Sequence, residues 1–306
     1  MKVRYWGVRG SIPVPGSSTV QVGGNTPCVS IELHDGSLVI VDGGTGLRNL
    51  GRHLLSQHAF ASGNGSAALL ISHRHWDHIH GIPFFEPAYV RGNRFEIYFP
   101  ASATAGDPLE DNAVSVSYSP ANFPVSYTDI KAAYRFHIAE ENVEFRVGSA
   151  TIRPVRLNHP GTVLGYVVSD NRGGDHGAAK VAYLTDTGPW EGPLLGDGMD
   201  DRNEPHDGRH AAYRLQVASA IQGADLVIHD TFFENRGYAG RAHWGHSAPR
   251  HALSLCRSTH VRRLHLFHFA PDLDDDSVAR MEAEARADAG PVEVAAAIEG
   301  LEIVLP

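Results

Sequence analysis

The amino-acid sequence predicts an α/β fold in which two β-sheets are buried. Short apolar segments bounded by glycine, histidine or aspartate are typical of strands, and longer amphipathic segments are typical of helices. These segments recur in the order strands, crossover helices, strands, crossover helices, and no linker-like change in composition separates the two halves. We therefore expect one α/β unit over residues 1–306, with loop insertions near 100–124 and 188–209.

The first half of the chain begins with β-structure. Its strands are expected where apolar residues run continuously or alternate with polar ones, and the pair Asp35-Gly36 is a hairpin signal between two of them. The spacing of apolar residues predicts a helix over 47–55. The predicted strands are 3–6, 29–33, 38–41, 67–71 and 95–99.

The second half repeats this alternation. Strands are predicted at 143–147, 150–157, 163–168, 180–184, 226–229 and 264–267, and helices at 211–222, 247–257 and 274–289. The last helix has acidic residues at its start, where the helix dipole favours negative charge. The segment 188–209 carries six acidic residues and almost no apolar pattern, so we expect a surface loop beside a cleft.

The composition excludes several classes of protein. The 26 Lys and Arg against 35 Asp and Glu give a formal charge of −9, which argues against non-specific electrostatic binding of nucleic acid. Cys28 and Cys256 are too few for a disulfide framework, and no segment is apolar enough for a secretion signal or a membrane span. We expect a cytoplasmic protein with no membrane partner. With 19 His, any bound metal must be held by imidazole and carboxylate groups.

The strongest functional signal directly follows the predicted strand 67–71. His73, His75, Asp77 and His78 place four metal-binding side chains within six residues. Positions two apart lie on one side of an extended chain, so His73 and His75 can face one ion, and a turn through Asp77 and His78 can face a second. The sequence therefore predicts a metal site here.

Three further candidate ligands each follow a predicted apolar strand. They are His159, Asp186 and His268. The carboxyl ends of strands are where α/β proteins place their sites, although each residue taken alone is also consistent with an ordinary polar loop. Five imidazoles and two carboxylates suit Zn²⁺, with Mn or Fe as alternatives, better than Mg²⁺ or Ca²⁺.

These seven residues, in this order, resemble the metallo-β-lactamase superfamily over nearly the whole chain. Shorter stretches resemble its ribonuclease Z and cyclic-phosphate phosphodiesterase branch: WGVRGSIP at 6–13, GGNTPC at 23–28, IHD at 228–230, WGHS at 244–247 and LFH at 266–268. The resemblance implies a four-layer αββα sandwich, in which two mixed sheets pack face to face with helices outside. It also implies a homodimer.

The resemblance further implies a dinuclear centre with a defined division of ligands. His73, His75 and His159 would hold one ion, Asp77, His78 and His268 the other, and Asp186 would bridge them.

Such a centre suits the hydrolysis of a phosphodiester by metal-bound hydroxide. Two ions about 3.5–4 Å apart deprotonate a shared water and clamp the nonbridging oxygens of the substrate. Two divalent ions with Asp77, Asp186 and one hydroxide leave a net positive charge that favours an anion. His246, held by Asp230, is the candidate general acid, so Asp77, Asp230 and His246 are the catalytic candidates. Alternatively, His246 caps the helix expected from 247.

The spacing of the ligands bears on the substrate. Ribonuclease Z enzymes carry a protruding basic arm between the third ligand histidine and the bridging aspartate, but only 27 positions separate His159 from Asp186, and they read as a hairpin. We therefore expect a small phosphodiester, such as a cyclic nucleotide or a cyclic ribose phosphate, and the sequence disfavours a long RNA.

Several alternative functions remain open. They are a tRNA 3′-processing endonuclease like ribonuclease Z, and a thioester hydrolase like glyoxalase II, which shares the ligands but not the stretch 244–247. An aspartate at position 186 disfavours a β-lactamase, and the presence of all seven ligands disfavours a binding module without activity.

Three residues near the ligands have two interpretations each, and a fourth departs from the family pattern. Asp42 is either a hydrogen-bond partner of a ligand histidine or a plain turn residue. His80 and His243 are either substrate contacts or solvated side chains, and Arg74 stands where the family usually has a small residue, which would alter the charge of the cleft.

Overall fold

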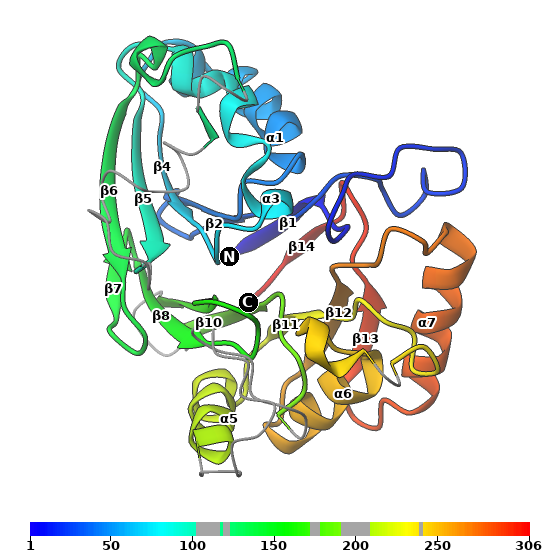
Figure 1. The fold of residues 1–306 in the computed structure, drawn as a ribbon. Helices are drawn as coiled ribbons and strands as arrows, with labels where there is room; N and C mark the ends of the chain where they lie inside the picture. Colours follow the sequence, from blue (N-terminus) through cyan, green and yellow to red (C-terminus); the bar gives the residue numbers. More distant parts are fainter. Residues whose placement is uncertain (102–116, 119–122, 172–177, 191–208, 239–240) are drawn as a thin grey trace.

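Two seven-stranded β-sheets pack face to face at the centre of the molecule, with helices on their outer sides (Figure 1). The computed structural model describes residues 1–101, 117–118, 123–171, 178–190, 209–238 and 241–306. This architecture confirms the predicted αββα sandwich. The two predicted loop insertions, 100–124 and 188–209, lie largely outside the described residues.

The first sheet has the strand order β14-β1-β2-β3-β4-β5-β6. β2 and β3 form the predicted hairpin, and Gly36 in their turn has a φ of 84°, which a residue with a side chain rarely adopts. β3, β4, β5 and β6 are parallel to one another. The strands are β1 Lys2–Gly7, β2 Cys28–Glu32, β3 Leu38–Val41, β4 Ser66–Leu70, β5 Arg94–Pro100, β6 Ala133–Ala139 and β14 Glu302–Val304.

The second sheet has the order β13-β12-β11-β10-β9-β8-β7. Its strands β10 to β13 are parallel, so their carboxyl ends meet at one edge of the sheet. Asp186 and His268 follow two of these strands, and Asp230 ends a third. The strands are β7 Phe145–Val147, β8 Ala150–Arg156, β9 Leu164–Asn171, β10 Ala178–Leu184, β11 Leu226–Asp230, β12 Arg263–Phe267 and β13 Glu293–Ala296.

The longer helices cover the outer faces of the sheets: α1 contacts β1 and β2, α5 contacts β8 and β10, and α6 and α7 contact the strands from β11 to β13. No helix among the described residues is long and apolar enough to cross a membrane. The helices are α1 Gly46–Leu55, α2 His58–Ala61, α3 Trp76–Ile79, α5 Arg209–Ile221, α6 Pro249–Ser258 and α7 Asp275–Ala287, with short 3-10 turns η1 Ile82–Phe84, η2 Glu86–Tyr89, η3 Tyr127–Asp129 and η5 Ala242–Trp244.

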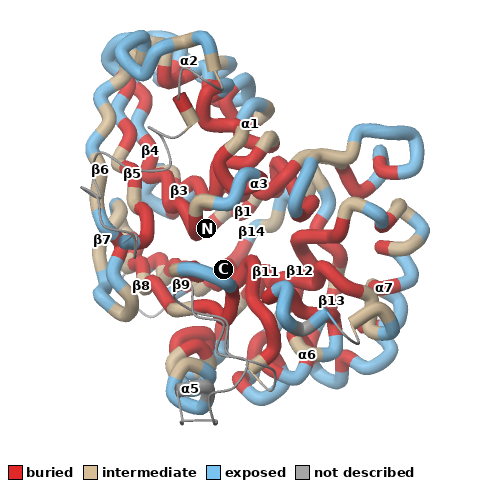
Figure 2. Tube along the Cα trace, viewed as in Figure 1, coloured by how far each residue is buried: buried red, intermediate tan, exposed pale blue. Residues whose placement is uncertain are grey.

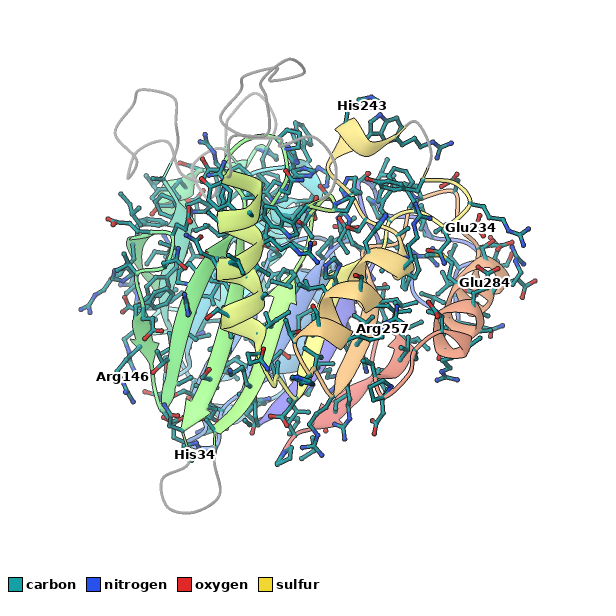
Figure 3. All side chains as sticks on the ribbon, turned by 90° about the horizontal axis from the view of Figure 1, so that it is seen from below. His34, Arg146, Glu234, His243, Arg257 and Glu284 are labelled. Atoms are coloured by element: carbon teal, nitrogen blue, oxygen red, sulfur yellow. The ribbon has the colours of Figure 1, made fainter. Side chains whose placement is uncertain are left out.

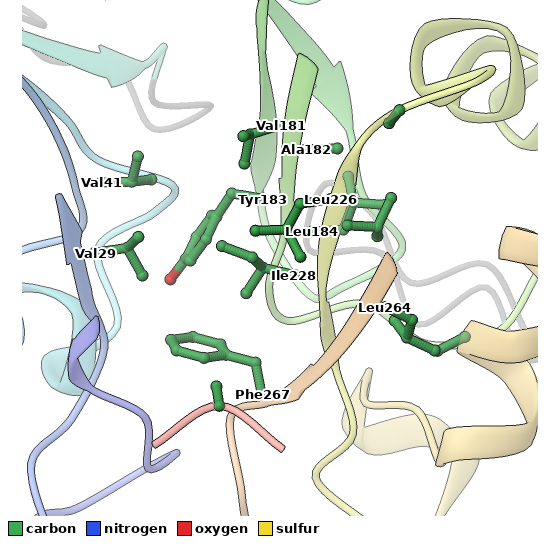
Figure 4. Close-up of a cluster of buried hydrophobic side chains, with 14 of the residues drawn as sticks. Val29, Val41, Val181, Ala182, Tyr183, Leu184, Leu226, Ile228, Leu264 and Phe267 are labelled. Atoms are coloured by element: carbon green, nitrogen blue, oxygen red, sulfur yellow. The ribbon is translucent and has the colours of Figure 1, made fainter. Parts of the chain in front are cut away.

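The inner faces of the two sheets form one hydrophobic core. Val29 and Val41 of the first sheet lie opposite Tyr183, Ile228 and Phe267 of the second, and all five are almost completely buried (Figure 4). Buried residues dominate the facing strands, and exposed residues lie on the outer helices and turns (Figure 2). Burial of side chains of this size stabilises the fold by about 1.5–3 kcal/mol each, which makes the sandwich a rigid support for the loops at its edge.

The structure adds elements that the sequence did not predict, namely β6, β13, β14, α2 and α3. The most relevant is α3, because a helical turn begins at Trp76 where the sequence indicated a simple turn through Asp77 and His78. Helix α6 begins at Pro249, two residues later than expected, because proline is favoured in the first turn of a helix.

Candidate dinuclear metal centre

All seven predicted ligands come together at one edge of the sandwich, although they are spread over nearly two hundred positions of the chain. Their ligand atoms form two clusters, and within each cluster these atoms lie within 4.8 Å of one another. One cluster is His73, His75, His159 and Asp186, and the other is Asp77, His78, Asp186 and His268. Asp186 belongs to both.

The two carboxylate oxygens of Asp186 face different clusters. Its Oδ2 lies 3.6 Å from Nε2 of His73 and 3.8 Å from Nε2 of His159. Its Oδ1 lies 3.1 Å from Nε2 of His78 and 3.2 Å from Nε2 of His268. This is the arrangement that a carboxylate bridging two ions requires.

The spacing of the remaining atoms is also that of metal ligands. Oδ2 of Asp77 is 3.2 Å from Nε2 of His78 and 3.1 Å from Nε2 of His268, and Nδ1 of His75 is 3.2 Å from Nε2 of His159. Ligands at 2.0–2.1 Å from one tetrahedral zinc ion lie about 3.3 Å apart. The residues therefore fit a dinuclear site for divalent ions.

Hydrogen bonds at Nδ1 orient three of the imidazoles so that Nε2 faces the clusters. Nδ1 of His78 donates to Asp42 (2.7 Å), Nδ1 of His159 donates to the carbonyl oxygen of Gly245 (2.8 Å), and Nδ1 of His73 donates to the hydroxyl oxygen of Ser72 (3.0 Å). A neutral ring with its proton on Nδ1 presents a lone pair on Nε2. The Nε2 atoms of His73 and His78 are buried and have no hydrogen-bond partner, which leaves them available to an ion.

The electrostatics of the clusters favour a bound cation. Burial lowers the pKa of His73, and lowers the pKa of His159 to about 3, so both rings are neutral. Burial opposes the charge of Asp186, but His268 and His78 outweigh it and hold the pKa of this carboxyl well below its usual range. At His78 burial opposes a positive charge, but the carboxylates of Asp77, Asp186 and Asp42 outweigh it and raise the pKa, so the metal-free ring holds a proton that a bound cation would displace.

Asp42 is a hydrogen-bond partner of a candidate ligand and not merely a turn residue. Its fully buried carboxylate accepts hydrogen bonds from Nδ1 of His78 and from the hydroxyl of Tyr183, each at 2.7 Å. It also accepts the backbone N–H and the hydroxyl of Ser72, at 2.7 and 2.9 Å. The role of Tyr183 was not predicted, because within the apolar strand β10 its ring is indistinguishable from an ordinary core residue.

The backbone of two loops lies in close contact with ligands of the two clusters. The backbone N–H of Ser11, which has a φ of 66°, donates to Oδ2 of Asp77 at 2.8 Å. Gly245 has a φ of 78°, and a Cβ atom at this position would overlap the ring of His159. The stretches 6–13 and 244–247, which carry the family resemblance, therefore both contact candidate ligands.

His246 and Asp230 form a buried pair beside both clusters. Nδ1 of His246 donates to Oδ2 of Asp230 at 2.7 Å, and the centroid of the His246 ring lies 5.0 Å from that of His159 and 5.3 Å from that of His268. Burial opposes protonation of His246, but the charge of Asp230 outweighs it and raises the pKa of the imidazole. Ala248 is the N-cap residue of α6, so His246 does not occupy the capping position.

The three other residues near the ligands lie farther out. His80 is half-buried and packs edge-on against Trp76, with ring centroids 5.1 Å apart. His243 is exposed on η5, at the periphery of the molecule (Figure 3). Arg74 is half-buried between His73 and His75 in the chain.

Removal of the Asp42 carboxylate should loosen metal binding without removing a ligand. In Asp42→Ala, His78 loses the acceptor that fixes its ring, and loss of such a partner typically lowers metal affinity by about 10–100-fold. Competition with a chromophoric chelator measures this affinity. Asp35→Ala, an exposed aspartate in the β2–β3 turn, is the control and should bind metal as the wild type does. Unchanged affinity in Asp42→Ala would contradict this role.

Comparison with known proteins agrees with the geometry. The family model described as "Beta-lactamase superfamily domain" matches residues 38–269. The chain is 26% identical to the ribonuclease Z of Haloferax volcanii over 295 residues, which cover 88% of this chain and 84% of the relative. The structure is similar to that of the short form of human tRNase Z (TM-score 0.64, 20% identity, all of both chains covered). It is also similar to that of a diphosphatase of the PhnP family (TM-score 0.62, 18% identity, 100% and 98% covered).

The matched family extends over most of the chain and includes all seven candidate ligands. The chain therefore belongs to the metallo-β-lactamase superfamily of metal-dependent hydrolases, in the branch that contains the ribonuclease Z proteins.

Proposed function

We propose that this protein hydrolyses a phosphodiester at the dinuclear centre. The observation that carries the proposal is the position of Asp186 between two histidine clusters, with the His246–Asp230 pair directly beside them. Two divalent ions bound there would supply Lewis-acid chemistry and an activated water. Zinc suits this mixture of imidazole and carboxylate ligands, and Mn²⁺ or Fe²⁺ are the alternatives.

The charge of the loaded site would select an anion. Asp77 and Asp186 are the two carboxylates among the seven ligands, so they leave two divalent ions with a net positive charge. At a distance of a few ångströms this local charge outweighs the overall charge of −9. A phosphodiester carries one negative charge and two ester oxygens, and it matches such a site.

His246 is the proposed proton donor to the leaving oxygen. Asp230 holds Nδ1–H of His246, which fixes the ring and keeps the imidazole protonated over a wider pH range, because it raises the pKa. Asp230 is itself held by the backbone N–H groups of Thr187 (3.0 Å) and Phe232 (2.9 Å). The pair is therefore positioned before a substrate arrives.

The segment between two of the ligands favours a small substrate. β9 and β10 pair in antiparallel register between His159 and Asp186, and only six residues join them. A basic RNA-binding arm of the kind that ribonuclease Z enzymes carry does not fit in this interval. A cyclic nucleotide or a cyclic ribose phosphate needs no such arm.

Processing of tRNA 3′ ends is the second candidate function. The observation that favours it is the similarity to a protein named ribonuclease Z over 88% of this chain. This function would require an RNA-binding surface elsewhere on the molecule.

A substrate panel separates these functions. We expect the metal-loaded protein to hydrolyse bis(p-nitrophenyl) phosphate and at least one cyclic nucleotide, and to leave a precursor tRNA uncut. Cleavage of the precursor without cleavage of the small diesters would establish the second candidate instead. Two results would contradict both candidate functions. One is hydrolysis of a glutathione thioester and of no phosphodiester, and the other is no hydrolysis at all by protein that carries two ions.

A further inference from the structure

Two exposed tryptophans lie beside the candidate metal centre, and the chemistry proposed above uses neither. Trp76 is 65% exposed and lies between His75 and Asp77 in the chain. Trp244 is 49% exposed and precedes Gly245, whose carbonyl oxygen binds His159.

The backbone of both tryptophans lies at the same end of the site. Trp76 adjoins His75, Trp244 lies within one residue of the contact to His159, and the ligand nitrogens of His75 and His159 are only 3.2 Å apart. Segments that are 168 positions apart in the sequence thus place one tryptophan each next to one cluster.

Exposure of two indoles needs an explanation, because a tryptophan typically buries about 150–250 Å² when it packs into a protein. By contrast, Trp6 near the N-terminus is buried and hydrogen-bonded to Ser30. Trp76 makes a perpendicular ring contact with His80, with centroids 5.1 Å apart. A ring left uncovered at an active-site edge is available to a ligand.

A cationic group accompanies the ring of Trp244. The guanidinium of Arg241 lies 5.9 Å from the ring centroid of Trp244 and 5.5 Å from that of Phe233. Arg241 is itself exposed, so its charge can also reach a phosphate. Aromatic faces interleaved with cations are the combination that binds the bases and phosphates of nucleotides.

We propose that Trp76 and Trp244 stack on an aromatic base of the substrate, so that this site prefers nucleotide phosphodiesters to phosphodiesters of sugars alone. The inference rests on the proposed phosphodiesterase function and narrows it. Every nucleobase has a π-face, and loss of one stacking ring typically weakens binding by about tenfold or more. The alternative, in which both indoles insert into a lipid surface, is an outcome of the test.

The test compares two esters with one leaving group. One is the p-nitrophenyl ester of thymidine 5′-phosphate, and the other is the same ester of 1-O-methyl-2-deoxyribose 5-phosphate, which lacks the base. The measured quantity is the ratio of kcat/KM for the base-bearing ester to that for the base-free ester. In Trp76→Leu and Trp244→Leu, which keep an apolar side chain but lose the ring, this ratio should fall by about tenfold each.

Two controls separate stacking from general damage. Trp76→Phe and Trp244→Phe should restore most of the ratio, because phenylalanine retains a π-face. Val304→Ala removes an equally exposed apolar side chain on β14, which pairs with the amino-terminal end of β1, and should leave the ratio unchanged. Equal ratios in the wild type and both leucine variants would overturn the inference.

A binding measurement on metal-free protein keeps this inference separate from the proposed function. Adenosine 5′-monophosphate should quench the tryptophan fluorescence of the wild type, ribose 5-phosphate should not, and the leucine variants should lose the quenching. If protein that carries two ions cleaves neither ester, the proposed function is wrong. The fluorescence measurement then still shows whether the two tryptophans stack on a base. Absence of quenching by the nucleotide, or binding of the wild type to anionic phospholipid vesicles in its place, would overturn the inference.

Discussion

Asp186→Ala is expected to release metal from both clusters and to lower turnover to background. One carboxylate oxygen of Asp186 faces His73 and His159, and the other faces His78 and His268, so a single substitution removes a ligand from each cluster. Loss of a hydrogen-bond partner of a ligand typically lowers metal affinity by about 10–100-fold. Loss of a ligand that both ions share should lower metal affinity by more than this. Elemental analysis after dialysis measures the metal content.

Asp225→Ala provides the matched control. Asp225 lies just before β11, at the opposite end of the same parallel strands, where it accepts from the backbone N–H of Lys180 and pairs with Arg262. This variant should keep two ions per chain. Two ions and normal turnover in Asp186→Ala would show that Asp186 does not bridge.

His246→Ala is expected to lower turnover of an alkyl phosphodiester by about 10²–10⁴-fold, the usual contribution of a general acid. The metal content should stay at two ions, because His246 lies in neither of the two four-residue clusters that share Asp186; it groups with Asp230 and His268, and its Nδ1 pairs with Asp230. The loss should be much smaller for a p-nitrophenyl ester, because p-nitrophenolate departs without a proton. This dependence on the leaving group distinguishes an acid from a structural residue.

His58→Ala, an exposed histidine on α2, is the control and should leave both substrates unaffected. Asp230→Asn should reproduce part of the His246→Ala defect, because the asparagine no longer supplies the negative charge that keeps the imidazole protonated. Loss of metal from His246→Ala would identify His246 as a ligand, and an equal loss of rate for both leaving groups would contradict proton donation.

Much of the fold could be predicted because the hydrophobic pattern of each segment agrees with the position that the segment takes in the folded chain. The strand β4 is wholly apolar in its last four residues and is followed at once by the histidine-rich segment, so its position could be inferred without any tertiary contact. The strand β6 was missed although Tyr134, Phe136 and Ile138 alternate with Arg135 and His137; it lies at the edge of its sheet, where most of its residues are half-buried or exposed. The last strand, β14, has three residues and depends on its pairing with β1.

The candidate ligands were predictable for a similar reason, and their supporting contacts were not. The seven ligands follow four apolar runs, which can be recognised in the sequence. The hydrogen bond from Tyr183 to Asp42 crosses from one sheet to the other over 141 positions, so only the folded chain reveals it. The exposure of Trp76 likewise depends on what packs around α3, and a tryptophan between two ligands gives no sign of this in the sequence.

Anomalous X-ray diffraction from metal-loaded crystals can show whether two ions share the carboxylate of Asp186. We expect two peaks about 3.5–4 Å apart, one among His73, His75 and His159 and one among Asp77, His78 and His268, with Asp186 between them. A single peak, or two peaks that Asp186 does not join, would contradict this arrangement.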